Sequence, residues 1–156
     1  MRSCDEILIR GFIAPLLHCF LLRGSIVPLF LESMNYLKLN DIDAYKISYG
    51  LSNYVWDIIV KWDYFCKDTV GKQFARAIDS ISANIAEGFG RYGKKDKIHF
   101  YRYSFGSVKE SLDWNQKAKV RKLIASEKYD FIFGELDKLP KLINQLIQYT
   151  NQTLKF

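Results

Sequence analysis

Downstream of Met34, apolar side chains recur at alternating spacings of three and four residues. This period places them on one stripe of an α-helix. Four such stripes follow one another, and each predicts one helix. Their members are Leu51, Val55, Ile58 and Trp62; then Phe74, Ile78, Ile81, Ile85 and Phe89; then Ile98, Tyr101, Phe105, Val108 and Leu112; and last Ile132, Leu136, Leu139, Ile143, Leu146 and Thr150.

The second stripe carries local signals for both ends of its helix. Asp68 or Thr69 is the expected N-cap, because a short polar side chain can accept a hydrogen bond from the first free backbone N–H groups. Glycines at Gly88, Gly90 and Gly93 predict the other end. We expect Gly90 or Gly93 to adopt the left-handed conformation that commonly ends a helix.

The remaining boundaries follow from the stripes. The first helix is expected from about Asp41 to Trp62, and the fourth to the C-terminus. Pro140 lies inside the fourth, where the stripe stays in phase, so we expect a kink and not an end. Residues 99–105 have β-propensity, but the unbroken spacing favours helix. Four amphipathic helices with short connections predict an all-α protein, an antiparallel up-down four-helix bundle.

Residues 1–33 differ from the rest. They are apolar, but their longest charge-free stretch, Gly11 to Leu22, has 12 residues, against the roughly 20 of a membrane-spanning helix. No small-residue cleavage site of a signal peptide follows the apolar run. We therefore expect no membrane association, an N-terminal extension over residues 1–33, and one bundle domain over residues 34–156.

The composition agrees with the prediction of one helical domain, and it shows an excess of basic residues. The 156 residues suit one domain, and 3 Pro with 9 Gly offer too few turns for a β-sandwich. Lys and Arg number 23 against 17 Asp and Glu, a net charge of +6. Residues 91–122 hold 10 basic and 3 acidic residues, a local charge of 10 − 3 = +7. A concentrated basic segment is typical of a surface for nucleic acid, although lysine-rich solvated helix faces produce the same pattern.

The candidate phosphate-contacting residues are the basic side chains of this segment: Arg91, Lys94, Lys95, Lys97, Arg102, Lys117, Lys119, Arg121 and Lys122. The segment from Gly88 to Gly93 matches G-x-G-x-x-G, but a helix and not a strand precedes it, so we interpret it as a helix end. The start of the third helix is a better phosphate site, since its first backbone N–H groups lie among lysines. Phe100 and Tyr103 lie off the stripe and could stack on bases.

Candidate chemistry beyond nucleic acid is sparse. Cys4, Cys19 and Cys66 form neither a disulfide framework nor a metal-ligand pattern, which predicts a reducing, cytoplasmic setting and no cofactor or metal. No set of catalytic residues is recognisable, so we do not expect an enzyme. We interpret Asn84 and Glu87 as structural, with Glu87 paired to Arg91, Arg76 or Arg102.

Two segments carry a family resemblance: Asp68 to Tyr92, with the core Ala83-Asn-Ile-Ala-Glu-Gly-Phe-Gly-Arg91, and Phe100 to Glu110. Over about residues 39–154 the chain resembles the four-helix-bundle 23S rRNA intervening-sequence proteins. It is more distantly similar to the accessory variability determinant (Avd) of diversity-generating retroelements. The family motif positions, structural before functional, are Arg76, Asn84, Glu87, Gly88, Gly90, Arg91, Ser107 and Glu110.

The resemblance implies a bacterial protein, an up-down bundle and a ring-like homopentamer. It also implies a role tied to nucleic acid, and no catalytic residues. Many members have Ser at the position of Gly93, so the cap of the third helix is expected to be weaker here. Two hypotheses follow: a non-enzymatic protein that binds RNA or DNA, or an oligomeric scaffold that docks a partner such as a reverse transcriptase or a ribosomal component.

Overall fold

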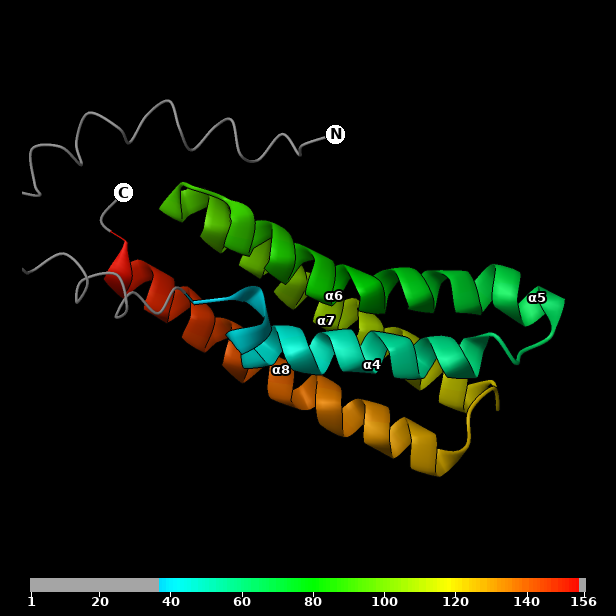
Figure 1. Cartoon of the computed structure of the whole chain (residues 1–156). Helices are drawn as coiled ribbons and strands as arrows, with labels where there is room; N and C mark the ends of the chain where they lie inside the picture. Colours follow the sequence, from blue (N-terminus) through cyan, green and yellow to red (C-terminus); the bar gives the residue numbers. More distant parts are fainter. Residues whose placement is uncertain (1–36, 155–156) are drawn as a thin grey trace, which may run out of the picture. The chain divides into compact units, whose positions relative to one another are not determined.

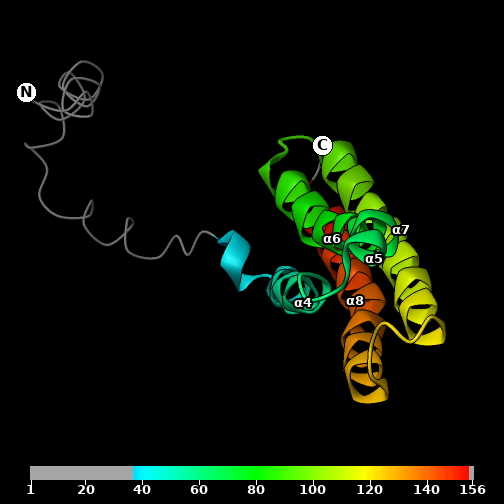
Figure 2. The ribbon, with the colours of Figure 1, turned by 90° about the vertical axis from the view of Figure 1, so that its right-hand side faces the viewer.

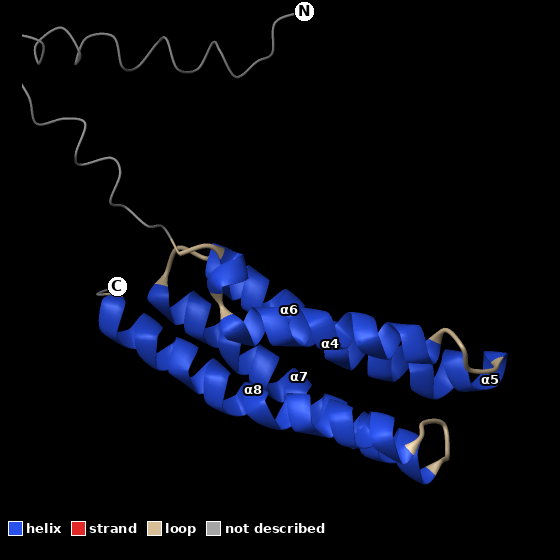
Figure 3. Cartoon of the chain, turned by 60° about the horizontal axis from the view of Figure 1, so that its bottom comes forward, coloured by secondary structure: helices blue, strands red, loops and turns tan. Residues whose placement is uncertain are grey.

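The structure is a computed structural model that describes residues 37–154. The expected extension over residues 1–33 lies outside the described residues. The helices are η1 (Leu39–Asp41), α4 (Asp43–Ile59), α5 (Tyr64–Cys66), the π-helical turn η2 (Lys67–Gly71), α6 (Lys72–Gly90), α7 (Lys94–Val120) and α8 (Ser126–Thr153). Residues 37–154 contain no strand, which confirms the all-α prediction for this part of the chain (Figure 3).

The four long helices form a helical bundle around one apolar core. α6 packs on α4 and α7, and α8 packs on α7 and α4, so each long helix has two neighbours (Figure 1). Figure 2 looks along α4 and shows the other three long helices on one side of it. Short connections join consecutive helices, at residues 91–93 between α6 and α7 and at residues 121–125 between α7 and α8.

The predicted stripes form this core. Every residue of the four stripes is buried except Trp62, Phe89, Phe105, Leu112 and Leu146, which are half-buried. The fourth helix continues through Pro140, as its stripe predicted. The first helix is shorter than expected, because α4 ends at Ile59 and Trp62 follows in the turn.

The N-cap prediction for the second helix is wrong. The helix begins at Tyr64, and Asp63 is its cap: the Asp63 carboxylate accepts a hydrogen bond of 2.9 Å from the backbone N–H of Cys66. Asp68 and Thr69 lie inside the helical path, in the π-helical turn that leads into α6. Asp63 and Asp68 are the same residue type five positions apart, so residue type alone did not distinguish the cap.

The left-handed glycine prediction is also wrong. No described glycine has a positive φ; Gly93 lies at φ −75° and serves as the N-cap of α7 without a side-chain hydrogen bond, as its lack of a side chain predicts. Gly88 has a different role. A Cβ there would lie 2.7 Å from Cε1 of Tyr101, so a glycine is what lets α6 approach the Tyr101 ring of α7.

Polar residues complete the core between α6, α7 and α8. Ser104 is fully buried and its hydroxyl donates a 3.0 Å hydrogen bond to the Ile81 carbonyl of α6. Burial raises the pKa of Tyr101 to about 12, and its hydroxyl meets Thr150 of α8. Buried polar groups that are satisfied across helices fix which helices are neighbours.

Candidate nucleic-acid interface

Eight of the ten basic residues of the 91–122 segment lie in two groups at opposite ends of α7. We call Arg91, Lys94, Lys95 and Lys97 the α6–α7 end, and Lys117, Lys119, Arg121 and Lys122 the α7–α8 end. At a rise of about 1.5 Å per residue, the 20 residues from Lys97 to Lys117 separate the two ends by roughly 30 Å. The exposed Arg102 and Lys109 lie between them. Most of the charge of this segment is therefore concentrated at the two ends of α7.

At the α6–α7 end, two lysines bind the ends of helices. The Lys97 ammonium donates to the carbonyls of Phe89 at 2.6 Å and Gly88 at 3.5 Å, in the last turn of α6. The Lys94 ammonium donates at 2.8 Å to the carbonyl of Asn151, in the last turn of α8. Cations are favourable there because the last carbonyls of a helix carry partial negative charge. Burial lowers the pKa of Lys97, which is half-buried.

Arg91 is also engaged within the chain. It pairs with Glu87, which confirms one of the pairings expected from the sequence, and its guanidinium lies 4.6 Å from the ring centre of Phe100. Phe100 is half-buried, whereas Tyr103 is exposed. The ring centres of Tyr103 and His99 lie 4.5 Å apart in an edge-to-face arrangement. Of the four basic residues at this end, Lys95 alone forms no side-chain hydrogen bond or ion pair within residues 37–154, and it is exposed. The α6–α7 end therefore has mainly a structural use for its cations.

The α7–α8 end presents its charges differently. Lys117 pairs with Asp113 and lies 4.3 Å from the Trp114 ring centre, while Lys119 lies 3.8 Å from the ring centre of Tyr129. Both lysines are half-buried. The Tyr129 ring holds the Lys119 ammonium near the surface without neutralising its charge, whereas Lys117 is also paired with a carboxylate.

Arg121 and Lys122 follow at the tip of this end. Both are exposed, and neither forms an ion pair with any other residue between 37 and 154. Lys122 has φ 59°, the one positive φ among the described non-glycine residues. The Lys122 backbone N–H donates to the Lys119 carbonyl at 2.9 Å. The Leu123 backbone N–H donates to the Ala118 carbonyl, also at 2.9 Å.

These two bonds are those of a Schellman motif with Lys122 at the left-handed C′ position, which glycine usually occupies. A residue with a Cβ is strained there by about 1 kcal/mol or more. The chain thus keeps a lysine where a glycine would relieve the strain.

Sequence reasoning missed two further cations at this end. Lys61 and Lys67 flank the α4–α5 connection and are exposed. The α7–α8 connection, which carries Arg121, lies at the same end of the bundle as α5 and these two lysines (Figure 1). No signal in the sequence joins residues 61–67 to residues 117–122, because the fold alone brings them together.

Most of the family motif residues have structural partners, but within residues 37–154 Arg76 contributes only its backbone carbonyl. Asn84 donates at 2.7 Å to the Ser80 carbonyl, Ser107 donates at 3.1 Å to the Tyr103 carbonyl, and Glu110 accepts a long bond of 3.5 Å from the Trp114 indole. The Arg76 carbonyl accepts from Ser80 at 2.6 Å. Gly90 is exposed and has open space around it.

Other site types find no counterpart in the described part of the chain. Within residues 37–154 no three His, Cys, Asp or Glu side chains cluster so that they could hold a metal ion. None of the helices in this range is both long and apolar enough to span a bilayer.

Comparison with known proteins identifies the fold. The structure resembles a solved protein of unknown function from the S23 ribosomal protein family of Bacteroides thetaiotaomicron VPI-5482, with a TM-score of 0.60 and 20% sequence identity over 67% of this chain and 97% of that one. No curated protein matches the chain. The family model of the 23S rRNA-intervening sequence proteins matches residues 40–145, which confirms the resemblance seen in the sequence. The chain belongs to the 23S rRNA-intervening sequence protein family.

Proposed function

We propose that this protein binds RNA or DNA without catalysing a reaction, and that the α7–α8 end is the binding surface. Four of the six residues from 117 to 122 are basic and none is acidic. Phosphate contacts supply most of the affinity of sequence-independent nucleic-acid binding, and exposed Arg and Lys side chains make them.

The observation that carries the proposal is the backbone of Lys122. A lysine in the left-handed conformation has no structural advantage over glycine at that position. Strained residues that persist in folded proteins are concentrated at functional sites. A cation retained there, beside the exposed Arg121, supports a use for its charge.

The assembly we propose is a ring-like homopentamer of antiparallel up-down bundles in the cytoplasm. Connections as short as residues 91–93 and 121–125 favour antiparallel neighbours. Exposed aromatic residues on α8, namely Phe131, Phe133 and Tyr149, offer material for a subunit contact. A ring would repeat the α7–α8 end around its axis and multiply its affinity for a polyanion.

A salt titration tests the proposal. Binding of a fluorescein-labelled 20-base-pair RNA duplex is measured by anisotropy between 25 and 200 mM KCl for the wild type and for the double variant Arg121→Glu/Lys122→Glu. We expect log affinity to fall linearly with log salt, by about 0.9 per phosphate contact. The double variant should bind less tightly, with a slope shallower by about 2.

The matched control is Lys38→Glu/Lys141→Glu. Both lysines are exposed and lie elsewhere in the chain, and the net charge changes by the same amount. Equal losses of RNA affinity in the two double variants would show that binding depends on the net charge of the protein and not on Arg121 and Lys122. An affinity that does not depend on salt would contradict phosphate contacts altogether.

A second candidate function is a scaffold that docks a protein partner, such as a reverse transcriptase or a ribosomal component. Val120 favours it, because this apolar side chain is 70% exposed amid the lysines of the α7–α8 end. Charge reversal at Lys119 and Arg121 would then abolish pull-down of the partner while leaving nucleic-acid binding unchanged. The opposite pattern favours the first function.

A further inference from the structure

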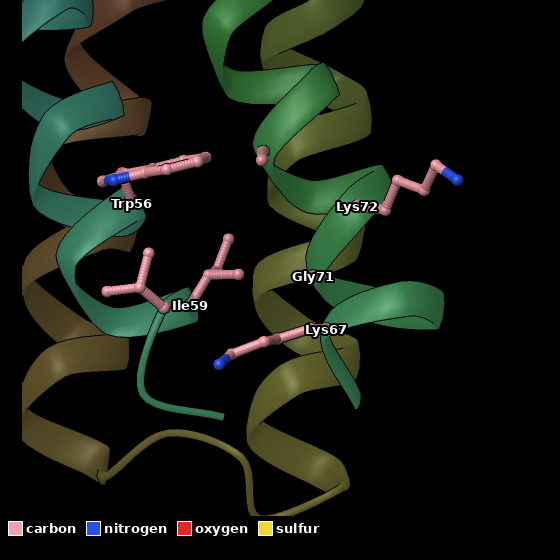
Figure 4. A pocket seen from close by; sticks show the side chains of 7 residues that line it. Trp56, Ile59, Lys67, Gly71 and Lys72 are labelled. Atoms are coloured by element: carbon pink, nitrogen blue, oxygen red, sulfur yellow. The ribbon is translucent and has the colours of Figure 1, made fainter. Parts of the chain in front are cut away.

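A groove of about 250 Å³ lies between the end of α4 and the start of the second long helix (Figure 4). The lining on the α4 side is apolar: Trp56 and Ile59 of the helix, and Val60 directly after it. The opposite side is formed by η2 and α6, through Lys67, Gly71, Lys72 and Ala75.

Two backbone features shape this groove. A Cβ on Gly71 would lie 2.8 Å from Cγ2 of Ile59, so glycine allows the two helices to meet at the floor. The helix is π-helical here, from Lys67 to Gly71. Such turns are rare and occur frequently at functional sites.

Trp56 leaves a large apolar surface open at the groove. Its side chain is 57% exposed, and it extends from α4 toward α6 in Figure 4. An exposed indole face beside small residues accommodates a flat ring system. At about 250 Å³ the groove is smaller than the roughly 300–1,000 Å³ of drug-sized pockets, which suits a single ring system.

The charge of the groove is positive. Its two ionisable lining residues are Lys67 and Lys72, and none is acidic. Figure 4 shows the Lys67 ammonium directed toward the end of α4, whereas Lys72 points away from the groove. Lys72 is also 3.7 Å from the Asp68 carboxylate. Lys67 is therefore the cation available to an anionic group next to a bound ring.

The groove lies at the same end of the bundle as the α7–α8 connection, which Figure 4 shows below Lys67. Arg121 belongs to that connection, which lies at the same end of the bundle as α5 (Figure 1). Tyr64 and Phe65, 83% and 73% exposed, begin α5. Lysines interleaved with exposed aromatic rings, joined to a basic surface, are typical of proteins that bind single strands.

We propose that this groove binds one unpaired base of single-stranded nucleic acid, stacked on Trp56, with an adjacent phosphate at Lys67. The proposal rests on the proposed function and adds a preference for single strands to it. Bases in a duplex are stacked on each other and cannot enter the groove, whereas bases of a single strand offer their faces to aromatic side chains. The continuity with Arg121 favours a polyanion over an acidic protein segment as the occupant.

The test compares a fluorescein-labelled 12-nucleotide RNA with the duplex of the same sequence, by anisotropy at 50 mM KCl. Trp56→Ala should weaken binding of the single strand by about 5- to 150-fold and leave duplex binding unchanged. Trp56→Phe should restore most of the affinity. Tyr49→Ala is the matched control, since Tyr49 is 56% exposed on α4 but does not line the groove.

A second variant guards against misfolding. Ala75→Leu fills the groove while leaving Trp56 in place, and it should weaken single-strand binding as well. Equal loss of single-strand and duplex binding in Trp56→Ala would overturn the proposal. Unchanged single-strand binding in Trp56→Ala would overturn it too. If that variant instead changes the oligomer mass, the groove is a contact between subunits and the proposal also fails.

The wild type separates the two levels of the hypothesis. If the wild type binds both RNAs and the groove variants bind them equally well, the groove proposal fails and the proposed function stands. If the wild type binds neither RNA at 50 mM KCl, the proposed function fails and the groove proposal fails with it.

Discussion

Replacing Lys122 with glycine should make the protein more stable and a weaker binder at once. Lys122 lies at φ 59°, where a Cβ crowds the following carbonyl oxygen. Glycine removes a penalty of about 1–2 kcal/mol, and the greater freedom of glycine in the unfolded chain takes back about 0.5–1 kcal/mol. The expected net gain is about 0.5–1 kcal/mol, a rise in Tm of roughly 2–5 °C for a domain of this size.

The same change removes one exposed cation from the α7–α8 end. If Lys122 contacts a phosphate, the salt slope of RNA binding should become shallower by about 1. Lys122→Ala separates the two effects, because alanine also lacks the charge but keeps the Cβ. Both variants should lose the same affinity, while Lys122→Gly alone should gain stability.

Stability is measured by urea unfolding followed by circular dichroism, at one fixed protein concentration because self-association contributes to apparent stability. A Lys122→Gly protein that is less stable than the wild type would refute the assignment of strain. If Lys122→Ala gains as much as Lys122→Gly, relief of the left-handed conformation is not the cause. Unchanged RNA binding in both variants would remove the main support for the proposed binding surface.

Two other predictions concern the bundle itself. Gly88→Ala should lower the free energy of unfolding in urea by about 1–3 kcal/mol, because its Cβ would lie 2.7 Å from the Tyr101 ring. Gly106→Ala is the control: Gly106 has open space around it, so alanine there should raise the free energy of unfolding by up to about 1 kcal/mol. Similar shifts in both variants would contradict the close approach of α6 to Tyr101. The cap made by Asp63 should depend on pH: its hydrogen bond to Cys66 holds the pKa below the usual 3.8, so its contribution to stability is complete above that value and is lost as pH falls through the folded-state pKa. Asp63→Ala should therefore cost stability at pH 6 and much less at pH 2, measured by thermal unfolding at both values, and an equal cost at the two would argue against the charged cap.

The helical stripes could be predicted because the information is local. Ile78, Ile81 and Ile85 are all fully buried, as their spacing on one face of a helix requires. Buried Ser104 and Asn115 gave no such signal. They share the inner face of α7 with apolar residues. The Ser104 hydroxyl and the Asn115 side-chain N–H donate to carbonyls of other helices, at Ile81 and Tyr129, while the Asn115 Oδ1 has no partner among residues 37–154.

The candidate site could be predicted only as a region. The concentration of Lys and Arg in residues 91–122 is visible in the sequence, but the partners of each charge are not. Lys94 donates to Asn151, which is 57 residues away along the chain. Lys97 reaches the end of the preceding helix, and the positive φ of Lys122 arises where predictions based on glycine did not place it.

The helices and their inner faces were readable from local pattern, because a 3.6-residue period and the burial of apolar surface act over neighbouring turns. The motif around Asn84 and Gly88 was enough to identify the family. Which cations are used within the fold, and which remain exposed, depends instead on helix packing. Tertiary structure also placed Trp56 across a groove from Lys67, at the same end of the bundle as the connection that carries Arg121 (Figure 1). Those relations depend on how separate helices pack, and no local pattern in the chain carries them.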